Sequence, residues 1–212
     1  WNATGGYDSK GAYEFDGVND VIDLGAGNVT MSPDSSSISF WVKTNSAGSV
    51  LFGKNNDNSP YIYLPDLNSW SIQSDVPATA KTYTIPAISL NSWYHIVVTR
   101  GAGNTRVYQN GVESSSGAQA IAGDLTVTQI GRYGDGSSGF WFNGTIDEVQ
   151  IFNRSLTPEQ ILNLYNNQSY LLDANETSVD DVWSATITPN DGTEDGTTVT
   201  SNNVTIVAAN TA

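Results

Sequence analysis

Short stretches in which apolar and polar residues alternate recur along most of the chain, separated by turn-forming residues. In Ser37–Thr44 the alternation places Phe40 and Val42 on one face and Trp41 on the other, which predicts a strand covered on both sides. The strands that this pattern predicts lie near Ala12–Phe15, Val21–Leu24, Ser37–Thr44, Ser49–Gly53, Tyr61–Leu64, Trp70–Gln73, Thr82–Ile85, Trp93–Arg100, Asn104–Gln109, Leu125–Arg132, Gly139–Asn143 and Thr145–Asn153. Many short strands at this spacing indicate an all-β protein, built as a two-sheet antiparallel sandwich.

The turns and the end of this region carry clear local signals. Asn110 and Gly111 predict a tight hairpin turn, because both residues tolerate a positive φ. Farther along, Thr157 can cap a helix that begins with Pro158, and Gln160 stands where a capping-box partner belongs. One face of this helix is apolar, formed by Ile161, Leu162, Leu164 and Tyr165. A helix this short is not stable alone in water, so we expect it to pack on the strands.

Five stretches of the sequence resemble the motifs of a known protein family, and they occur in the same order as in that family. They are GAYEFDGVNDVIDLG (Gly11–Gly25), SISFWVKT (Ser37–Thr44), SWYHIVVTR (Ser92–Arg100), TRVYQNGV (Thr105–Val112) and FNGTIDEVQIFNRSLTPEQILNLY (Phe142–Tyr165). Together they resemble the motifs of the laminin-G-like, concanavalin-A-like jelly rolls, over roughly residues 5 to 168. The resemblance implies two stacked antiparallel sheets with one short capping helix. It does not fix the function, because the family includes sugar binders, protein binders and structural spacers.

The character of the sequence changes after Gln168. Two strand-like runs, Val182–Pro189 and Thr198–Ala209, resemble the last two strands of an immunoglobulin-like surface domain. We therefore predict a laminin-G-like sandwich over residues 1–171 and a partial immunoglobulin-like hairpin over residues 172–212. A lone hairpin is marginal in water, and an open sheet edge is a template for pairing. Either the chain is a piece of a longer protein, or another subunit completes its sheets by strand complementation.

Composition narrows the class of protein. The chain of 212 residues contains no cysteine, which excludes disulfides, thiolate zinc sites and cysteine nucleophiles. Eight Lys and Arg stand against 22 Asp and Glu, giving a formal net charge of −14. The negative electrostatic field of such a chain repels nucleic acid and anionic membranes, and it attracts cations. No apolar run approaches the length of a membrane span.

Acceptor sequences for N-glycosylation are numerous. The motif Asn-x-Ser/Thr occurs at Asn2, Asn28, Asn143, Asn153, Asn167, Asn175 and Asn203. A composition rich in Asn, Ser and Thr produces such matches by chance, whereas a glycosylated surface would explain them by function. We favour the second interpretation and expect an extracellular or cell-surface protein.

Carboxylates suggest a cation site. The family resemblance implies that the first and last strands lie close together, which would bring Asp16 and Asp147 within reach of one Ca²⁺, with Asn19 as a further ligand. Calcium takes roughly six to eight hard oxygens, so such a site would need backbone carbonyls as well. The alternative is that Asp16 and Asp147 cap turns and accept backbone N–H bonds.

Catalysis is not expected. Glycosidases of this fold class place two carboxylates on one strand, but the acids between Lys43 and Asp124 show no such alternation; they are Asp57, Asp66, Asp75 and Glu113. His95, the only histidine, has no Ser or Cys motif nearby. We predict that His95 is packed and hydrogen-bonded within its strand and that the chain is not an enzyme.

Sugar binding needs an aromatic ring for the apolar face of the sugar and polar groups for its hydroxyls. Candidates are Tyr61, Tyr63 and Trp70, with Asn56 and Asp57 in a neighbouring loop. Tyr133 and Trp141 are further aromatic candidates. The alternative is that the tyrosines fill one sheet face and that Phe140 and Trp141 pack under the helix.

Two functions remain in competition. The leading hypothesis is a non-catalytic structural or adhesive surface protein, a repeating subunit of a filament or surface layer. Its partners would be other copies of itself or neighbouring surface proteins. The second hypothesis is a carbohydrate-binding, lectin-like module of a larger secreted enzyme or adhesin.

Overall fold

The structure is a computed structural model that describes residues 1–25, 28–55, 60–75, 78–134, 140–167, 177–188 and 196–208. Its contacts divide the chain into two compact units, Trp1–Asn167 and Gln168–Ala212. The first unit is the all-β sandwich that the alternation predicts, with one short helix.

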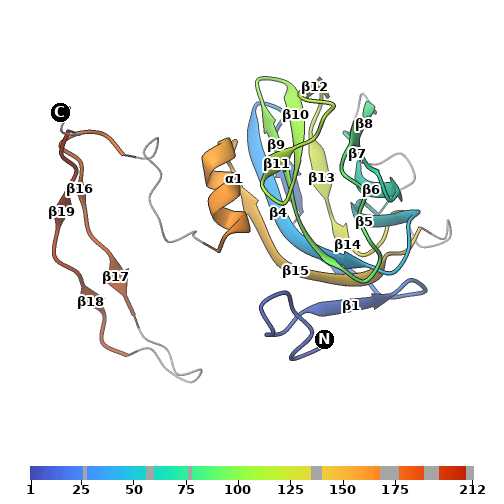
Figure 1. Cartoon of the computed structure of the whole chain (residues 1–212), viewed down its shortest axis with the longest axis horizontal. Coiled ribbons are helices and arrows are strands. Elements are labelled where there is room, and N and C mark those ends of the chain that lie inside the picture. Colours follow the sequence, from blue (N-terminus) through green and yellow to red (C-terminus); the bar gives the residue numbers. More distant parts are fainter. Residues whose placement is uncertain are drawn as a thin grey trace. The chain divides into compact units, whose positions relative to one another are not determined.

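Two antiparallel sheets face each other in the first unit (Figure 1). The larger sheet has the order β1 (Tyr13–Asp16), β15 (Asn143–Phe152), β4 (Ser35–Thr44), β9 (Trp93–Gly101), β10 (Asn104–Gln109) and β11 (Val112–Glu113), with β12 (Gln119–Ala120) also paired to β10. The smaller sheet has the order β2 (Ile22–Asp23), β14 (Gln129–Ile130), β5 (Ser49–Gly53), β6 (Tyr61–Asp66), β7 (Ser69–Gln73) and β8 (Ala80–Thr84). A separate pair joins β3 (Val29–Met31) and β13 (Leu125–Val127). Because neighbours such as β4 and β15 are far apart in sequence, long-range pairing holds the sandwich together.

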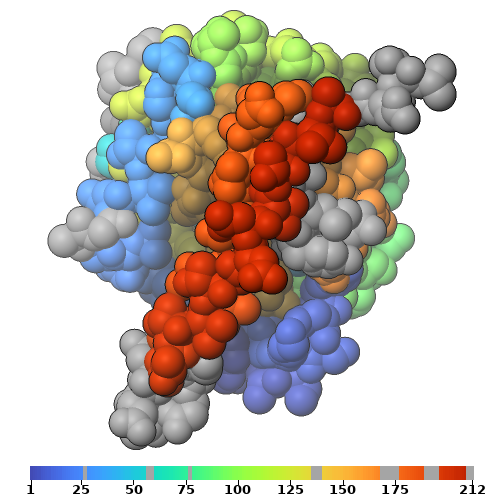
Figure 2. Space-filling view, turned by 90° about the vertical axis from the view of Figure 1, so that its left-hand side faces the viewer, coloured from blue at the N-terminus to red at the C-terminus, as the bar shows by residue number. Residues whose placement is uncertain are grey.

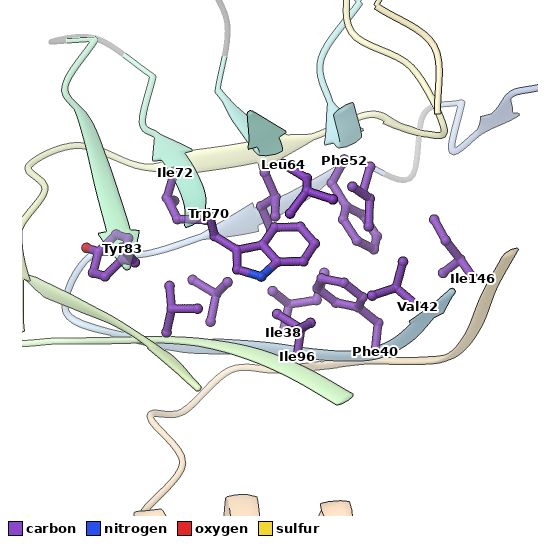
Figure 3. Close-up of a cluster of buried hydrophobic side chains, with 14 of the residues drawn as sticks. Ile38, Phe40, Val42, Phe52, Leu64, Trp70, Ile72, Tyr83, Ile96 and Ile146 are labelled. Carbon is purple, nitrogen blue, oxygen red and sulfur yellow. The ribbon is translucent and has the colours of Figure 1, made fainter. Parts of the chain in front are cut away.

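The hydrophobic core lies between the two sheets. Figure 3 shows Phe52, Leu64 and Trp70 of the smaller sheet pointing toward Phe40 and Val42 of the larger one. Trp41 lies on the opposite face of β4, where Tyr7 and Tyr165 stack on its indole. The alternation predicted for Ser37–Thr44 is therefore confirmed, including the second layer that covers Trp41.

The predicted helix is confirmed as α1 (Pro158–Tyr165). Thr157 caps it, and Thr157 and Gln160 form the reciprocal capping box. Ile161 packs in a small cluster with Val97, Tyr108 and Leu156, so the helix covers the outer face of β9 and β10. The predicted turn is confirmed as well, because Asn110 and Gly111 have φ values of 51° and 79°.

The last strand departs from strict alternation. The pairing of β15 with β4 shifts register between Asp147 and Gln150, and Glu148 has a φ of 48°. This bulge inserts one residue, so that Ile146 and Val149 both pack against the core. Strict two-residue alternation would instead place these two residues on opposite faces of the strand.

The sheet edges are partly covered by their own chain. Next to β1, Asn2 and Ala12 exchange two backbone hydrogen bonds of 2.9 Å. At β8, the carbonyl of Thr84 accepts from the backbone N–H of Ser115, and the carbonyl of Thr82 accepts from the side chain of Gln119. These contacts satisfy groups that would otherwise be open to another strand.

The second unit is a narrow antiparallel ribbon, drawn in orange and red in Figure 2. Its pairs are β16 (Val182–Trp183) with β19 (Val204–Thr205) and β17 (Thr186–Ile187) with β18 (Val199–Thr200). The predicted antiparallel pairing of the two runs is confirmed. The resemblance to an immunoglobulin-like domain stays a prediction.

Candidate functional site

Four aromatic side chains gather on the outer face of the smaller sheet. Tyr61 and Tyr63 point outward from β6, because the alternate residues Ile62 and Leu64 are buried in the core. Tyr133 and Phe140 come from the connection between β14 and β15, where the backbone N–H of Tyr133 donates to the carbonyl of Phe140. We call Tyr61, Tyr63, Tyr133 and Phe140 the aromatic cluster.

The rings of the aromatic cluster form a closed circuit. Ring centroids are 5.9 Å apart for Tyr61 and Tyr63, 6.5 Å for Tyr63 and Phe140, 6.0 Å for Phe140 and Tyr133, and 5.8 Å for Tyr133 and Tyr61. Each neighbouring pair meets edge to face, with planes at 79° to 81°. These rings line a cavity of about 340 Å³ together with Val50, which is buried on β5. Phe140 is 41% exposed, so the cavity is open to a ligand from solvent.

The basic side chains closest to this cavity in sequence have other partners. Lys54 forms an ion pair of 2.9 Å with Asp75. The guanidinium of Arg132 lies 5.2 Å from the ring centre of Trp141 and donates to the side-chain carbonyl of Gln129. No charged side chain of the described residues lines the cavity. The chemistry that it offers is apolar and aromatic, with phenol hydroxyls as the polar groups of the rings.

Trp70 is not part of this site. Its side chain is 0% exposed and lies between the sheets, with its ring 6.1 Å from that of Phe40 (Figure 3). The prediction that Trp70 contacts a sugar is wrong, because Trp70 takes the inward position of β7 in the strand alternation. Tyr61 and Tyr63 do lie together, whereas Asn56 and Asp57 lie outside the described residues.

The sequence did not identify Phe140 as a member of the site. The alternative that Phe140 and Trp141 pack under the helix is also wrong, since Phe140 contacts Tyr63 and Tyr133, and Trp141 faces Arg132. The conformation of the connection before β15 decides these contacts, and no periodic pattern encodes it.

The structure does not bring Asp16 and Asp147 together, as the predicted shared calcium site of Asp16, Asn19 and Asp147 requires. Asp16 pairs with Asn143, and Asp147 lies four residues farther along β15, a separation of about 13 Å at the rise of a strand. Asp16 instead accepts from the backbone N–H groups of Val18 and Asn19, and these bonds lower the pKa of its carboxyl.

Asp147 has a structural role of its own. Its two oxygens accept from the backbone N–H groups of Tyr7 and Glu148, each at 2.9 Å. Both aspartates therefore hold turns, the alternative that the sequence left open. The described residues contain no group of three or more acidic or histidine side chains placed to hold a metal. Melting with and without a chelator tests whether the chain binds calcium elsewhere.

His95 is packed within β9, as predicted. It is 2% exposed, and its Nε2 lies 2.8 Å from the hydroxyl of Ser39. Burial lowers the pKa of the imidazole to about 4. Ser39 and His95 do not form a triad, because the Nδ1 of His95 has no hydrogen-bond partner among the described residues and the Ser39 hydroxyl is buried.

The acids of the middle region have structural partners. Asp66 accepts from the backbone N–H of Asn68 and from the hydroxyl of Ser69. Asp75 pairs with Lys54, and Glu113 pairs with Arg106 at 2.6 Å. Asp57 lies outside the described residues.

The acceptor asparagines differ in accessibility. Asn28, Asn153, Asn167 and Asn203 are exposed. Asn2 and Asn143 are half-buried, and their side-chain amides are bonded to Glu14 and Asn45 respectively. Asn175 lies outside the described residues. Occupancy of these sites stays a prediction that intact mass measurement can test.

A two-sheet sandwich with an aromatic cavity on its outer face defines a protein of the lectin-like β-sandwich class. Residues 16–162 match the sequence profile of the Concanavalin A-like lectin/glucanases superfamily, and the chain belongs to this superfamily. The described residues include no helix of the length and apolarity that crossing a bilayer requires.

Solved structures share the fold. A native heptameric SAP-like pentraxin from Limulus polyphemus is 17% identical, with a TM-score of 0.55, and the match covers 72% of this chain and 80% of the pentraxin. Domain 4 of AbnA, an extracellular arabinanase from Geobacillus stearothermophilus solved in complex with arabinotriose, is 23% identical, with a TM-score of 0.52 and coverage of 76% and 78%. NanB sialidase from Streptococcus pneumoniae is 15% identical, with a TM-score of 0.54, and the match covers 84% of this chain but 31% of the sialidase. At these identities the comparisons establish the fold alone.

Proposed function

We propose that this chain is a non-catalytic carbohydrate-binding module that recognises a neutral glycan through the aromatic cluster. The observation that carries the proposal is the closed circuit of four rings around an open cavity of about 340 Å³. Aromatic side chains pack on the apolar C–H faces of sugars, and a partly enclosed aromatic cavity is the usual form of a small-ligand site. Membership of a lectin and glucanase superfamily supports this ligand class, as does the arabinotriose bound to the related arabinanase domain.

A binding role rather than a catalytic one is supported by the acids themselves. Asp66, Asp75 and Glu113 are each bonded to neighbouring groups of the sandwich, and none of them lines the aromatic cavity. An extracellular location is a further part of this proposal, and the seven Asn-x-Ser/Thr motifs support it.

Glycan-array screening followed by calorimetry tests the proposal. We expect a neutral glycan to bind the full chain, and we expect Tyr63→Ala and Phe140→Ala each to weaken binding by about tenfold or more, which corresponds to about 1.4 kcal/mol. Tyr13→Ala is the matched control, because Tyr13 is an exposed ring on β1 of the other sheet. Equal losses in all three variants, or no binding of any glycan, would refute the proposal.

A second candidate function is adhesion or assembly through the ribbon of the second unit. The supporting observation is a set of exposed apolar side chains that lie opposite one another on the paired strands. Trp183 is opposite Val204, and Ile187 is opposite Val199. Under this hypothesis the ribbon associates with a further sheet of another copy or of a neighbouring surface protein. Filament formation is the extreme form of such association.

A further inference from the structure

The orientation of the rings restricts how a sugar can enter the aromatic cluster. A flat polysaccharide face needs rings that lie side by side in one plane. Here every neighbouring pair of rings is close to perpendicular, at 79° to 81°. Four rings in a closed circuit with these angles make the sides of a cavity rather than a platform. A single unit at the end of a glycan fits such a cavity better than an internal segment that continues in both directions.

The polarity of the lining restricts which part of that unit enters. The described residues that line the cavity are Val50, Tyr61, Tyr63, Tyr133 and Phe140, and their only side-chain polar atoms are three phenol hydroxyls. A buried sugar hydroxyl without a partner loses its hydrogen bonds to water, which weakens binding. A methyl group in the same place gains burial and loses no hydrogen bond. The described part of the lining therefore favours an edge of the sugar that bears a methyl group.

Charge restricts the ligand further. No charged side chain of the described residues lines the cavity, and Lys54 and Arg132 are engaged with Asp75 and with Trp141 and Gln129. The chain as a whole carries a net charge of −14. An anionic sugar would meet an unfavourable field with no basic partner at the site.

We propose that the aromatic cluster binds the terminal unit of a neutral glycan by inserting a methyl-bearing edge, such as the methyl of a 6-deoxy sugar or of an acetamido group. This inference rests on the proposed carbohydrate-binding function and adds the ligand class and the direction of entry. It predicts discrimination between sugars that differ by one hydroxyl at the inserted edge.

Matched pairs of free sugars test the inference by NMR titration of the full chain. L-Rhamnose is compared with L-mannose, and L-fucose with L-galactose, since each pair differs at C6 by methyl against hydroxymethyl. In at least one pair we expect the methyl sugar to bind about tenfold tighter. Phe140→Ala and Tyr63→Ala should remove this preference, while Tyr13→Ala should retain it. N-acetylglucosamine against N-formylglucosamine tests an acetamido methyl, because these two sugars differ by that methyl group alone.

The direction of entry is tested with oligosaccharides of increasing length that carry the preferred sugar at one end. If only the terminal unit binds, the affinity for an oligosaccharide should not depend on its length, and this is the result that we expect. If internal units bind as well, the affinity should rise with the length of the oligosaccharide. Equal binding of both members of every pair, or affinity that grows with length, would overturn this inference and leave the proposed function intact. Absence of binding by any neutral sugar would overturn both. Tighter binding of tetramethylammonium than of the methyl sugars would also overturn the inference, because cation–π attraction would then define the site.

Discussion

One buried polar side chain, that of Arg100, links separate segments of the sandwich through its hydrogen bonds. Arg100 is fully buried at the end of β9, and its guanidinium donates to the carbonyls of Met31, Ile121 and Gly123. Burial lowers the pKa of this group, but three carbonyl acceptors from two separate segments compensate for the lost hydration. Arg100 thus joins β9 to the end of β3 and to the connection that follows β12.

Trp70 provides a test that separates stability from binding. The indole is fully buried among Phe40 and the other core residues, so Trp70→Ala should lower the free energy of unfolding by about 3 to 5 kcal/mol. Trp70→Phe should cost less, because the indole N–H has no protein partner to lose. Urea unfolding measures both changes in stability. Under conditions in which Trp70→Phe is fully folded, calorimetry should give the same glycan affinity as for the wild type. Loss of binding with unchanged stability would place Trp70 in the site and contradict its position in the core.

His95 should make stability depend on pH. Burial holds the pKa of the folded imidazole at about 4, against about 6.5 in the unfolded chain. Between these values the unfolded state binds a proton that the folded state does not, so the free energy of unfolding falls as the pH is lowered from about 6.5 to about 4. The full contribution is about 3 kcal/mol.

The matched measurement for His95 is the difference between wild type and His95→Gln in urea unfolding across this pH range. The carboxylates titrate in both proteins, so the difference isolates the imidazole. We expect wild type to lose stability relative to the variant as the pH falls. A difference that stays constant with pH would show that His95 is not buried in its neutral form.

Residue-level roles were predictable where strand alternation decides them. The opposite faces of Phe40 and Trp41 and the packing of His95 follow from two-residue periodicity and are confirmed. The same rule, applied to Trp70, gives an inward position once the register of β7 is known, but the sequence alone leaves the register open. Phe140 was beyond prediction, because its place depends on the conformation of an irregular connection.

At the scale of elements, the helix is the clearest case in which local sequence determines structure. Thr157, Pro158 and Gln160 set its beginning, and the capping box forms as the sequence predicts. The bulge in β15 is the opposite case. Glu148 adopts a positive φ there, and because this residue is not a glycine the sequence does not indicate the bulge. Asp147 stabilises this bulge by accepting from the backbone N–H of Glu148, a contact that becomes visible only in the folded chain.

Neighbouring residues of α1 give a matched prediction. Ile161 is fully buried against Val97, Tyr108 and Leu156, whereas Leu162 is 45% exposed. Ile161→Ala should lower the free energy of unfolding by about 2 to 5 kcal/mol, and Leu162→Ala by less than about 1 kcal/mol. Thr157→Ala should cost about 1 kcal/mol through the lost cap. Chemical denaturation compares the three variants, and equal costs for Ile161→Ala and Leu162→Ala would contradict the packing of the helix on β9 and β10.

At the scale of the whole molecule, the two units differ in what they bury. The sandwich encloses a core between two sheets, and its β1 and β8 edges carry bonds from Asn2, Ser115 and Gln119. The ribbon pairs its strands but leaves most of the described side chains exposed. The two-sheet architecture of the sandwich could be predicted from periodicity and motif order, whereas the bulge in β15 and the short strands β3 and β12 could not. The state of the ribbon could not, since pairing alone does not reveal what covers its side chains.

Exposed apolar pairs on the ribbon give the last prediction. Ile187 and Val199 are directly opposite each other, as are Trp183 and Val204, and burying such pairs against a further sheet would gain about 25 cal/mol for each Å² of apolar surface. We expect sedimentation velocity of the full chain to show association that increases with concentration. Ile187→Lys with Val204→Lys should shift the chain toward the monomer, because each lysine would bring a charge into the contact, while glycan binding at the aromatic cluster should be unchanged. A monomer at all concentrations would exclude assembly through the ribbon, and association that survives both substitutions would assign it to another surface.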